Sequence, residues 1–189
     1  MDQWVGYLNR ASGIVASILI VAALGWGFFF SSRSMGTRLR PAWWLDLHNW
    51  LGGTGLIFTV IHVGLAWSDT NAGIGLQQIV VPGTSTLDRW GITWGVLAFY
   101  SMIAVVFTTW PRRLGHRTLW RIVHLTSIVG TGLALLHAYV SGSDATHLIF
   151  RAGLLVLVGF ATYALWLRIL GVMAGRSADT KRRPARSSP

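Results

Sequence analysis

The 189-residue chain contains no cysteine and few charged residues. The absence of cysteine excludes disulfides, thiolate-ligated haem, iron–sulfur clusters and cysteine-based zinc sites. Only 12% of the residues are charged, whereas 52% are hydrophobic and 11 are tryptophans. A water-soluble domain usually carries about twice that share of charge, so the composition is typical of a membrane protein.

Long stretches without Asp, Glu, Lys or Arg mark the segments that can cross a membrane. Four of them, each 22 residues long, cover 11–32, 47–68, 90–111 and 122–143, and a fifth, over 146–173, is interrupted only by Arg151 and Arg168 near its ends. About 20 apolar residues span a bilayer as a helix, and no segment shows the alternation of a barrel strand. The sequence therefore predicts an all-α, polytopic transmembrane bundle of five helices, forming one transmembrane domain over residues 1–173.

Acidic residues are scarce: 6 Asp and Glu face 16 Lys and Arg, for a net charge of +10. In a soluble protein this excess would suggest a nucleic-acid partner, but 13 of the 16 basic residues fall in alternate connections and near the C-terminus. The positive-inside rule then predicts an N-terminus outside and a C-terminus inside, in a multi-pass protein of the inner cell membrane that contacts lipid and no nucleic acid. Residues 174–189 are interpreted as a disordered basic cytosolic tail.

Two of the apolar stretches carry two histidines each. His48 and His62 are fourteen residues apart, and His124 and His137 are thirteen apart. At about 1.5 Å of rise per residue, the two spacings are roughly 21 and 20 Å, so each helix holds one imidazole near either edge of the hydrocarbon layer. Both helices run in the same direction, which predicts an inner pair (His48 and His124) and an outer pair (His62 and His137).

A lone histidine in a membrane helix often serves only as a hydrogen-bonding residue between helices. Four imidazoles at two matched depths, with no carboxylate or thiol beside them, instead favour two haems, each held by one histidine from each helix. The thirteen-residue spacing adds a constraint, because at about 100° per residue it misses the starting direction by roughly 140°. We therefore expect the 122–143 helix to bend or overwind near 127–132, or to present its two imidazoles from different flanks.

These features resemble the ferric reductase-like transmembrane domain family. The resemblance rests on thirteen residues between His48 and His62, twelve between His124 and His137, and an Arg-Ala-Ser-Gly start at Arg10. That family includes the membrane parts of ferric reductases and NADPH oxidases, and the haem-binding subunit of the periplasmic methionine sulfoxide reductase system. It implies that the four histidines are axial ligands of two b-type haems that pass electrons across the membrane.

The chain departs from the family pattern in two respects. Members commonly have six helices where five are predicted here, and many carry a flavin and nicotinamide domain for which the sequence offers no GxGxxG motif. The resemblance therefore implies an electron donor that is separate from this chain. Candidates are a cytosolic flavin reductase with FMN or FAD, free reduced flavin, or membrane quinol.

Haem propionates need cationic partners, for which arginine is best suited. Arg121, three residues before His124, lies on about the same helix face, and Arg40 and Arg117 are further candidates for the inner haem. Arg10 is a candidate for the outer haem. No catalytic side chain is assigned.

The sequence thus predicts electron transfer to an extracytoplasmic acceptor such as ferric iron, oxygen or a partner enzyme. It leaves open whether the chain is itself an oxidoreductase or the electron-transfer subunit of one. Two alternatives are a quinol-linked cytochrome b that anchors a larger oxidoreductase complex, and a non-enzymatic haem-binding membrane protein.

Overall fold

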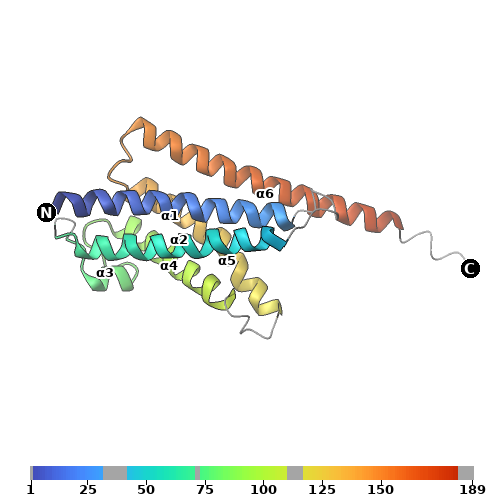
Figure 1. Cartoon of the computed structure of the whole chain (residues 1–189), viewed down its shortest axis with the longest axis horizontal. Coiled ribbons are helices and arrows are strands. Elements are labelled where there is room, and N and C mark those ends of the chain that lie inside the picture. Colours follow the sequence, from blue (N-terminus) through green and yellow to red (C-terminus); the bar gives the residue numbers. More distant parts are fainter. Residues whose placement is uncertain (1, 32–41, 71–72, 110–116, 183–189) are drawn as a thin grey trace, which may run out of the picture.

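The computed structural model describes residues 2–31, 42–70, 73–109 and 117–182, and within them every regular element is a helix. Five of the described helices are long and apolar enough to cross a membrane. The prediction of an all-α bundle with five spans is therefore confirmed. In chain order (Figure 1), the helices are α1 (Asp2–Ser31), α2 (Ala42–Ser68), α3 (Leu76–Val80), α4 (Arg89–Thr109), α5 (Arg117–Ser141) and α6 (Leu148–Arg182).

Two of the helices extend beyond their apolar runs. α1 begins at Asp2, so the mixed polar and apolar residues 2–10 before the uncharged stretch belong to the same helix. α6 continues past Met173 to Arg182, so the domain boundary predicted between residues 173 and 174 falls inside a helix. Residues 183–189 of the predicted tail lie outside the described residues.

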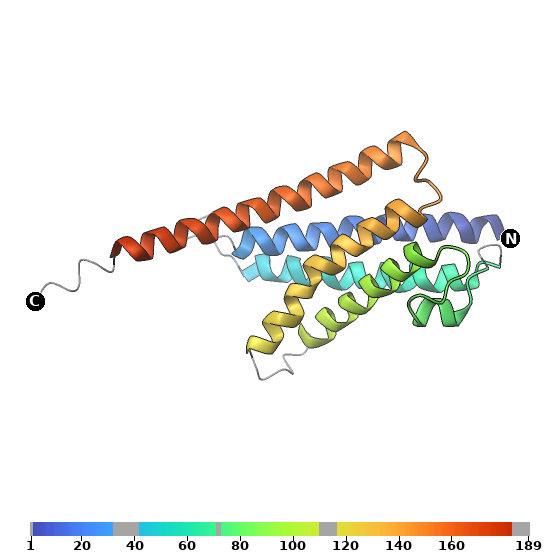
Figure 2. The same cartoon turned by 180° about the vertical axis from the view of Figure 1, so that it is seen from behind.

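The spans form two close-packed hairpins, α1 with α2 and α4 with α5, while α6 packs mainly along α1 (Figures 1 and 2). Successive spans alternate in direction, so α2 and α5 run the same way, as the histidine pairing requires. The N-terminus and the end of α6 lie at opposite ends of the bundle.

Small side chains allow the hairpins to pack closely. Gly130 of α5 lies against Ser101 of α4, whose Oγ donates a hydrogen bond to the carbonyl of Thr126 at 3.0 Å. Gly55 of α2 lies against Met102 of α4 and also against α1. Glycine therefore serves close helix packing at these positions.

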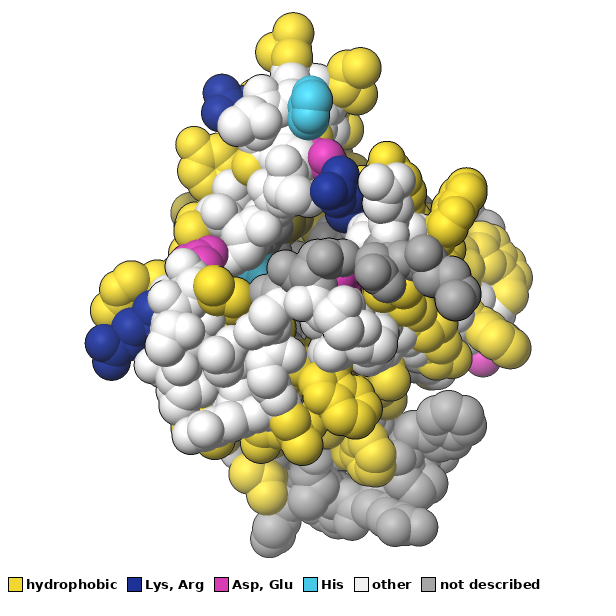
Figure 3. All heavy atoms as spheres, turned by 90° about the vertical axis from the view of Figure 1, so that its left-hand side faces the viewer, with side chains coloured by type: hydrophobic (Ala, Val, Ile, Leu, Met, Phe, Trp, Pro, Cys, Tyr) yellow, Lys and Arg dark blue, Asp and Glu magenta, His cyan; other side chains and the backbone are white. Residues whose placement is uncertain are grey.

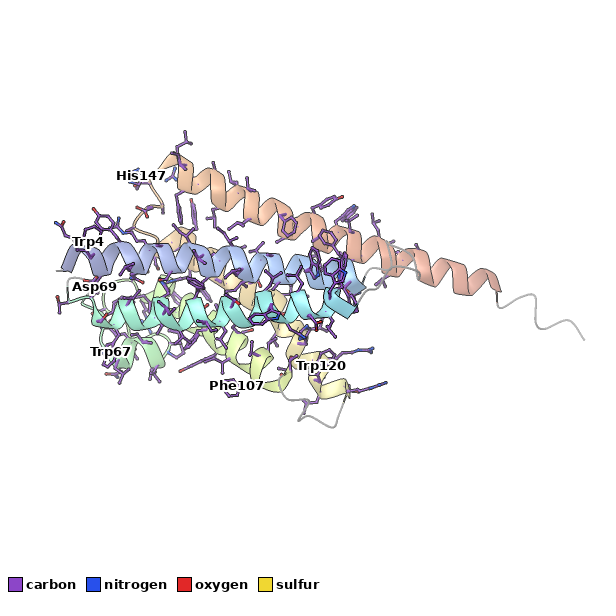
Figure 4. All side chains as sticks on the ribbon, viewed as in Figure 1. Trp4, Trp67, Asp69, Phe107, Trp120 and His147 are labelled. Carbon is purple, nitrogen blue, oxygen red and sulfur yellow. The ribbon has the colours of Figure 1, made fainter. Side chains whose placement is uncertain are left out.

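The outer surface of the spans is apolar. Large side chains such as Phe107, Ile149 and Leu155 are 70%, 88% and 71% exposed. Helices of this kind are suited to contact with lipid, which supplies the apolar surroundings that water would not. Figure 4 shows two exposed tryptophans, Trp4 and Trp67, at the same end of the bundle, where an aromatic belt is expected.

The end of the bundle that holds the N-terminus also holds the long connection between α2 and α4. Viewed onto this end, arginine and acidic side chains lie together among hydrophobic ones (Figure 3). The short α3 lies in that connection, and the hydroxyl of Tyr100 on α4 donates to the Val80 carbonyl at its end. The connection is thus fastened to α4.

Candidate functional site

Each spanning histidine of α2 faces one of α5. The ring centroids of His48 and His124 are 5.9 Å apart, and those of His62 and His137 are 6.2 Å apart. No Cα atom of α2 comes within 8 Å of a Cα atom of α5 over the described part of the two helices, so the rings face each other across a gap. The structure thus brings together the same two pairs that the sequence spacing groups.

The separations within the pairs suit a shared metal. Two imidazoles on opposite sides of one metal ion, each bound at about 2.0 Å, place their ring centroids roughly 6 Å apart. The planes within the pairs are inclined at 59° and 69°, so the rings are not stacked on each other. The spacing of each pair could therefore admit one metal ion between the two rings.

Three of the four imidazoles donate their Nδ1–H group to a backbone carbonyl. His62 donates to Asn9 at 2.9 Å and His48 to Ala23 at 3.0 Å, both on α1, while His137 donates to Gly91 of α4 at 2.8 Å. A carbonyl oxygen can only accept, so Nδ1 carries the proton and Nε2 keeps its lone pair. This tautomer is the one that a metal-binding histidine needs, and the hydrogen bond also fixes the ring.

A glycine lies one helical turn after each of these carbonyls. A Cβ atom on Gly13, Gly27 or Gly95 would lie 2.9, 3.2 or 2.9 Å from the ring of His62, His48 or His137, respectively. The missing side chain therefore leaves room for the imidazole to reach the carbonyl four residues earlier. On α1 the two carbonyl–glycine sets are fourteen residues apart, the same spacing as between the two histidines of α2.

His124 is held differently. Its Nδ1 atom is buried and has no hydrogen-bond partner among the described residues, which costs about 1–3 kcal/mol for a buried donor. Instead, the indole of Trp120, one turn earlier on α5, stacks on its ring with centroids 5.0 Å apart and planes 21° apart. Backbone carbonyls thus hold both rings of the outer pair but only one ring of the inner pair, whose other ring is held by an indole.

The shape of α5 bears on the expectation drawn from the thirteen-residue spacing. α5 is α-helical without interruption from Arg117 to Ser141, and its first turns run at a steeper angle than the rest (Figure 2). His137 is turned toward α4, whereas His124 makes no hydrogen bond to that helix. Both imidazoles reach a histidine of α2, with ring centroids 5.9 and 6.2 Å apart, and the flank from which each leaves α5 stays a prediction.

The arginines predicted to meet propionates lie at both ends of the bundle. Arg10 follows Asn9 at the outer end and pairs with Asp144 at 3.4 Å, with its guanidinium over the Tyr7 ring. Arg117 and Arg121 are exposed near the start of α5 at the inner end. Arg40 lies outside the described residues. Propionate binding by these four side chains stays a prediction.

The sequence reasoning missed a carboxylate beside the outer pair. Asp88 accepts hydrogen bonds from Ser141 Oγ at 2.5 Å and from the Gly91 amide at 2.9 Å. These bonds hold the pKa of Asp88 below its usual range. Because the Gly91 carbonyl accepts from His137, Asp88 helps to fix the peptide units on which the outer pair depends.

An apolar cavity of about 550 Å³ opens between α1, α5 and α6. Its lining includes Phe28, Leu135 and Leu155, with Tyr139 and Arg151 among the few polar members. No histidine lines it, so it is separate from the two pairs.

Comparison with known proteins adds no identification, because no family model, curated protein or solved structure matches the chain.

Proposed function

We propose that the chain is a membrane cytochrome that holds two b-type haems, one in each histidine pair, and passes electrons across the membrane. The observation that carries the proposal is the pair of facing imidazoles at each of two depths, three of them fixed by carbonyls in the tautomer that exposes Nε2. A purely structural histidine needs one hydrogen-bond partner. It does not need a second imidazole opposite its other nitrogen.

The donor set fits haem better than other metal groups. Each site offers two neutral nitrogen ligands from opposite sides, and no group of three or more His, Cys, Asp or Glu side chains among the described residues forms a conventional metal site. Zinc and copper sites usually take three or four protein ligands, whereas haem iron needs only two axial ones because the macrocycle supplies four nitrogens. When bound, haem supplies reversible one-electron chemistry.

The protein itself determines where the two sites lie in the membrane. Fourteen residues of α2 separate the two sites by roughly 21 Å along the helix, which brings one site near each surface of the membrane. The α1 and α4 carbonyls fix the ligands, and the apolar helices keep water away from them. A donor on one side and an acceptor on the other can then exchange electrons without meeting.

We infer a cytosolic donor, either reduced flavin or a flavoprotein, with membrane quinol as the other source. The acceptor lies outside the inner cell membrane and is ferric iron, oxygen or a partner enzyme. The resemblance of the histidine spacing to the ferric reductase-like family supports this direction, as does the accumulation of basic residues at one end.

The proposal is tested with purified protein in proteoliposomes that enclose a membrane-impermeant ferric chelate. Reduced flavin added outside should reduce the enclosed chelate through chains inserted in the matching orientation. Replacing either member of either pair by alanine should abolish this transfer, whereas Gly159→Ala on α6, where a Cβ would meet nothing within 4 Å, should not. Reduction that is unchanged without the histidines would refute the proposal.

A further inference from the structure

The four imidazoles share a pattern that fails at one position. His48, His62 and His137 each lie over a carbonyl on a neighbouring helix with a glycine one turn further on. His124 has no such acceptor, and its Nδ1 atom is buried and unpartnered within the described structure. An imidazole that ligates through Nε2 still needs something to fix its ring.

The stretch of α4 at the depth of His124 differs from the stretch at the depth of His137. This helix runs antiparallel to α5, so stepping back thirteen residues from His137 to His124 corresponds to stepping forward thirteen residues along α4. That step leads from Gly91 and Gly95 to Ala104 and Thr108. Here the second residue is not glycine, and the hydroxyl of Thr108 itself donates to the Ala104 carbonyl at 2.7 Å. At this depth α4 therefore carries a hydroxyl side chain where the second glycine would stand.

Trp120 lies against the ring instead. Its indole stacks on His124 with the planes 21° apart, and its Nε1–H donates to Thr109 Oγ1 at 3.3 Å. The Thr109 hydroxyl in turn donates to the Val105 carbonyl at 2.7 Å. The indole is therefore tied to the end of α4, and Figure 4 shows Trp120 near the inner end of the bundle.

We propose that Trp120 is the positioning residue of His124 and that it makes the inner site unlike the outer one. The inference rests on the proposed haem ligation. Stacking against a flat indole fixes the tilt of the imidazole plane, but it leaves the Nδ1–H group without an acceptor. A histidine whose Nδ1–H is not engaged is a weaker electron donor through Nε2 than one bonded to a carbonyl. The inner site thus combines one strong and one weak ligand, whereas the outer site combines two strong ones.

The experiment compares Trp120→Leu, Trp120→Phe and the control Trp166→Leu in purified full-length protein with haem bound. Trp166 is 58% exposed on α6, a helix that carries no histidine, so its replacement removes the same side chain from a lipid-facing position. Two quantities are measured: haem per chain, and the low-spin ferric electron paramagnetic resonance signals, whose anisotropy depends on the relative orientation of the two imidazole planes. The signal of the outer site is the internal reference.

Trp120→Leu should shift or broaden the inner signal and release up to one of the two haems, leaving the outer signal as in the unaltered protein. Trp120→Phe keeps an aromatic face and should restore most of the inner signal, while Trp166→Leu should change neither. Two unchanged signals in a Trp120→Leu protein that retains both haems would overturn the inference and leave the proposed function standing. An unaltered protein that binds no haem would overturn both.

Discussion

The substitution Gly13→Ala tests how the outer pair is held. A Cβ atom there would lie 2.9 Å from two ring atoms of His62, closer than the 3.4–4 Å of an ordinary contact. Either the ring or α1 must move, and the 2.9 Å hydrogen bond from His62 to the Asn9 carbonyl lengthens or breaks. The change is small in volume but falls on a single, well-defined contact.

The magnitudes separate a site effect from a folding effect. Losing one hydrogen bond costs about 0.5–1.5 kcal/mol net, while alanine in place of glycine inside a helix returns up to about 1 kcal/mol. The free energy of unfolding should therefore change little. Loss of a hydrogen bond that orients a metal ligand typically lowers metal affinity by about 10–100-fold, and we expect that loss at the outer site only.

The assay follows the transfer of haem from the purified protein to excess apomyoglobin, together with the thermal unfolding midpoint. Gly159→Ala is the matched control, because it makes the same chemical change on a spanning helix where a Cβ would meet nothing within 4 Å. The outer haem should leave faster from Gly13→Ala than from the control, and the inner haem at an equal rate. Identical haem loss from the two variants would refute the reasoning about the glycine.

Three further predictions concern the pairing of the histidines, the orientation of the chain in the membrane, and the dependence of stability on low pH. Alanine at either member of the inner pair should remove the same haem, and alanine at either member of the outer pair should remove the other. Absorption spectra of the four variants check this. Any other grouping of the variants would mean that the pairs are wrongly assigned. A reporter enzyme fused after Pro189 should be active in the cytoplasm, because the basic residues gather at that end; activity only outside would exchange the inner and outer labels. Hydrogen bonds hold the pKa of Asp88 below the usual range of an aspartate, so the stability that its carboxylate contributes is present above the unfolded pKa and is lost as pH falls through the lower folded pKa. The unfolding midpoints of the unaltered protein and of Asp88→Asn should therefore converge in acid, and a constant difference down to the acid limit would contradict this.

The five spans were predictable because few backbone structures can satisfy their hydrogen bonds inside lipid. Uncharged runs of 22 residues can only be helices when no water is present to satisfy the backbone, and the structure has a spanning helix at each. The helix ends were less predictable, because hydropathy marks only the apolar part of a helix, whereas α1 already starts at Asp2. α6 likewise runs on to Arg182 after its apolar part has ended.

The pairing of the histidines also followed from spacing, since rise per residue sets depth and chain direction sets partners. The groups that hold the rings did not, because backbone carbonyls carry no residue-type signal. The sequence did contain one signal of these contacts: Gly13 and Gly27 are fourteen residues apart, as are His48 and His62. Gly13 also ends the Arg-Ala-Ser-Gly start, and its contact with His62 gives that short motif a physical role.

The central claim is tested most directly by a reduced-minus-oxidised absorption spectrum with pyridine haemochrome quantification on the purified protein. The account predicts two low-spin b-type haems per chain, both lost when all four spanning histidines are replaced. One haem or none per chain in the unaltered protein would contradict it.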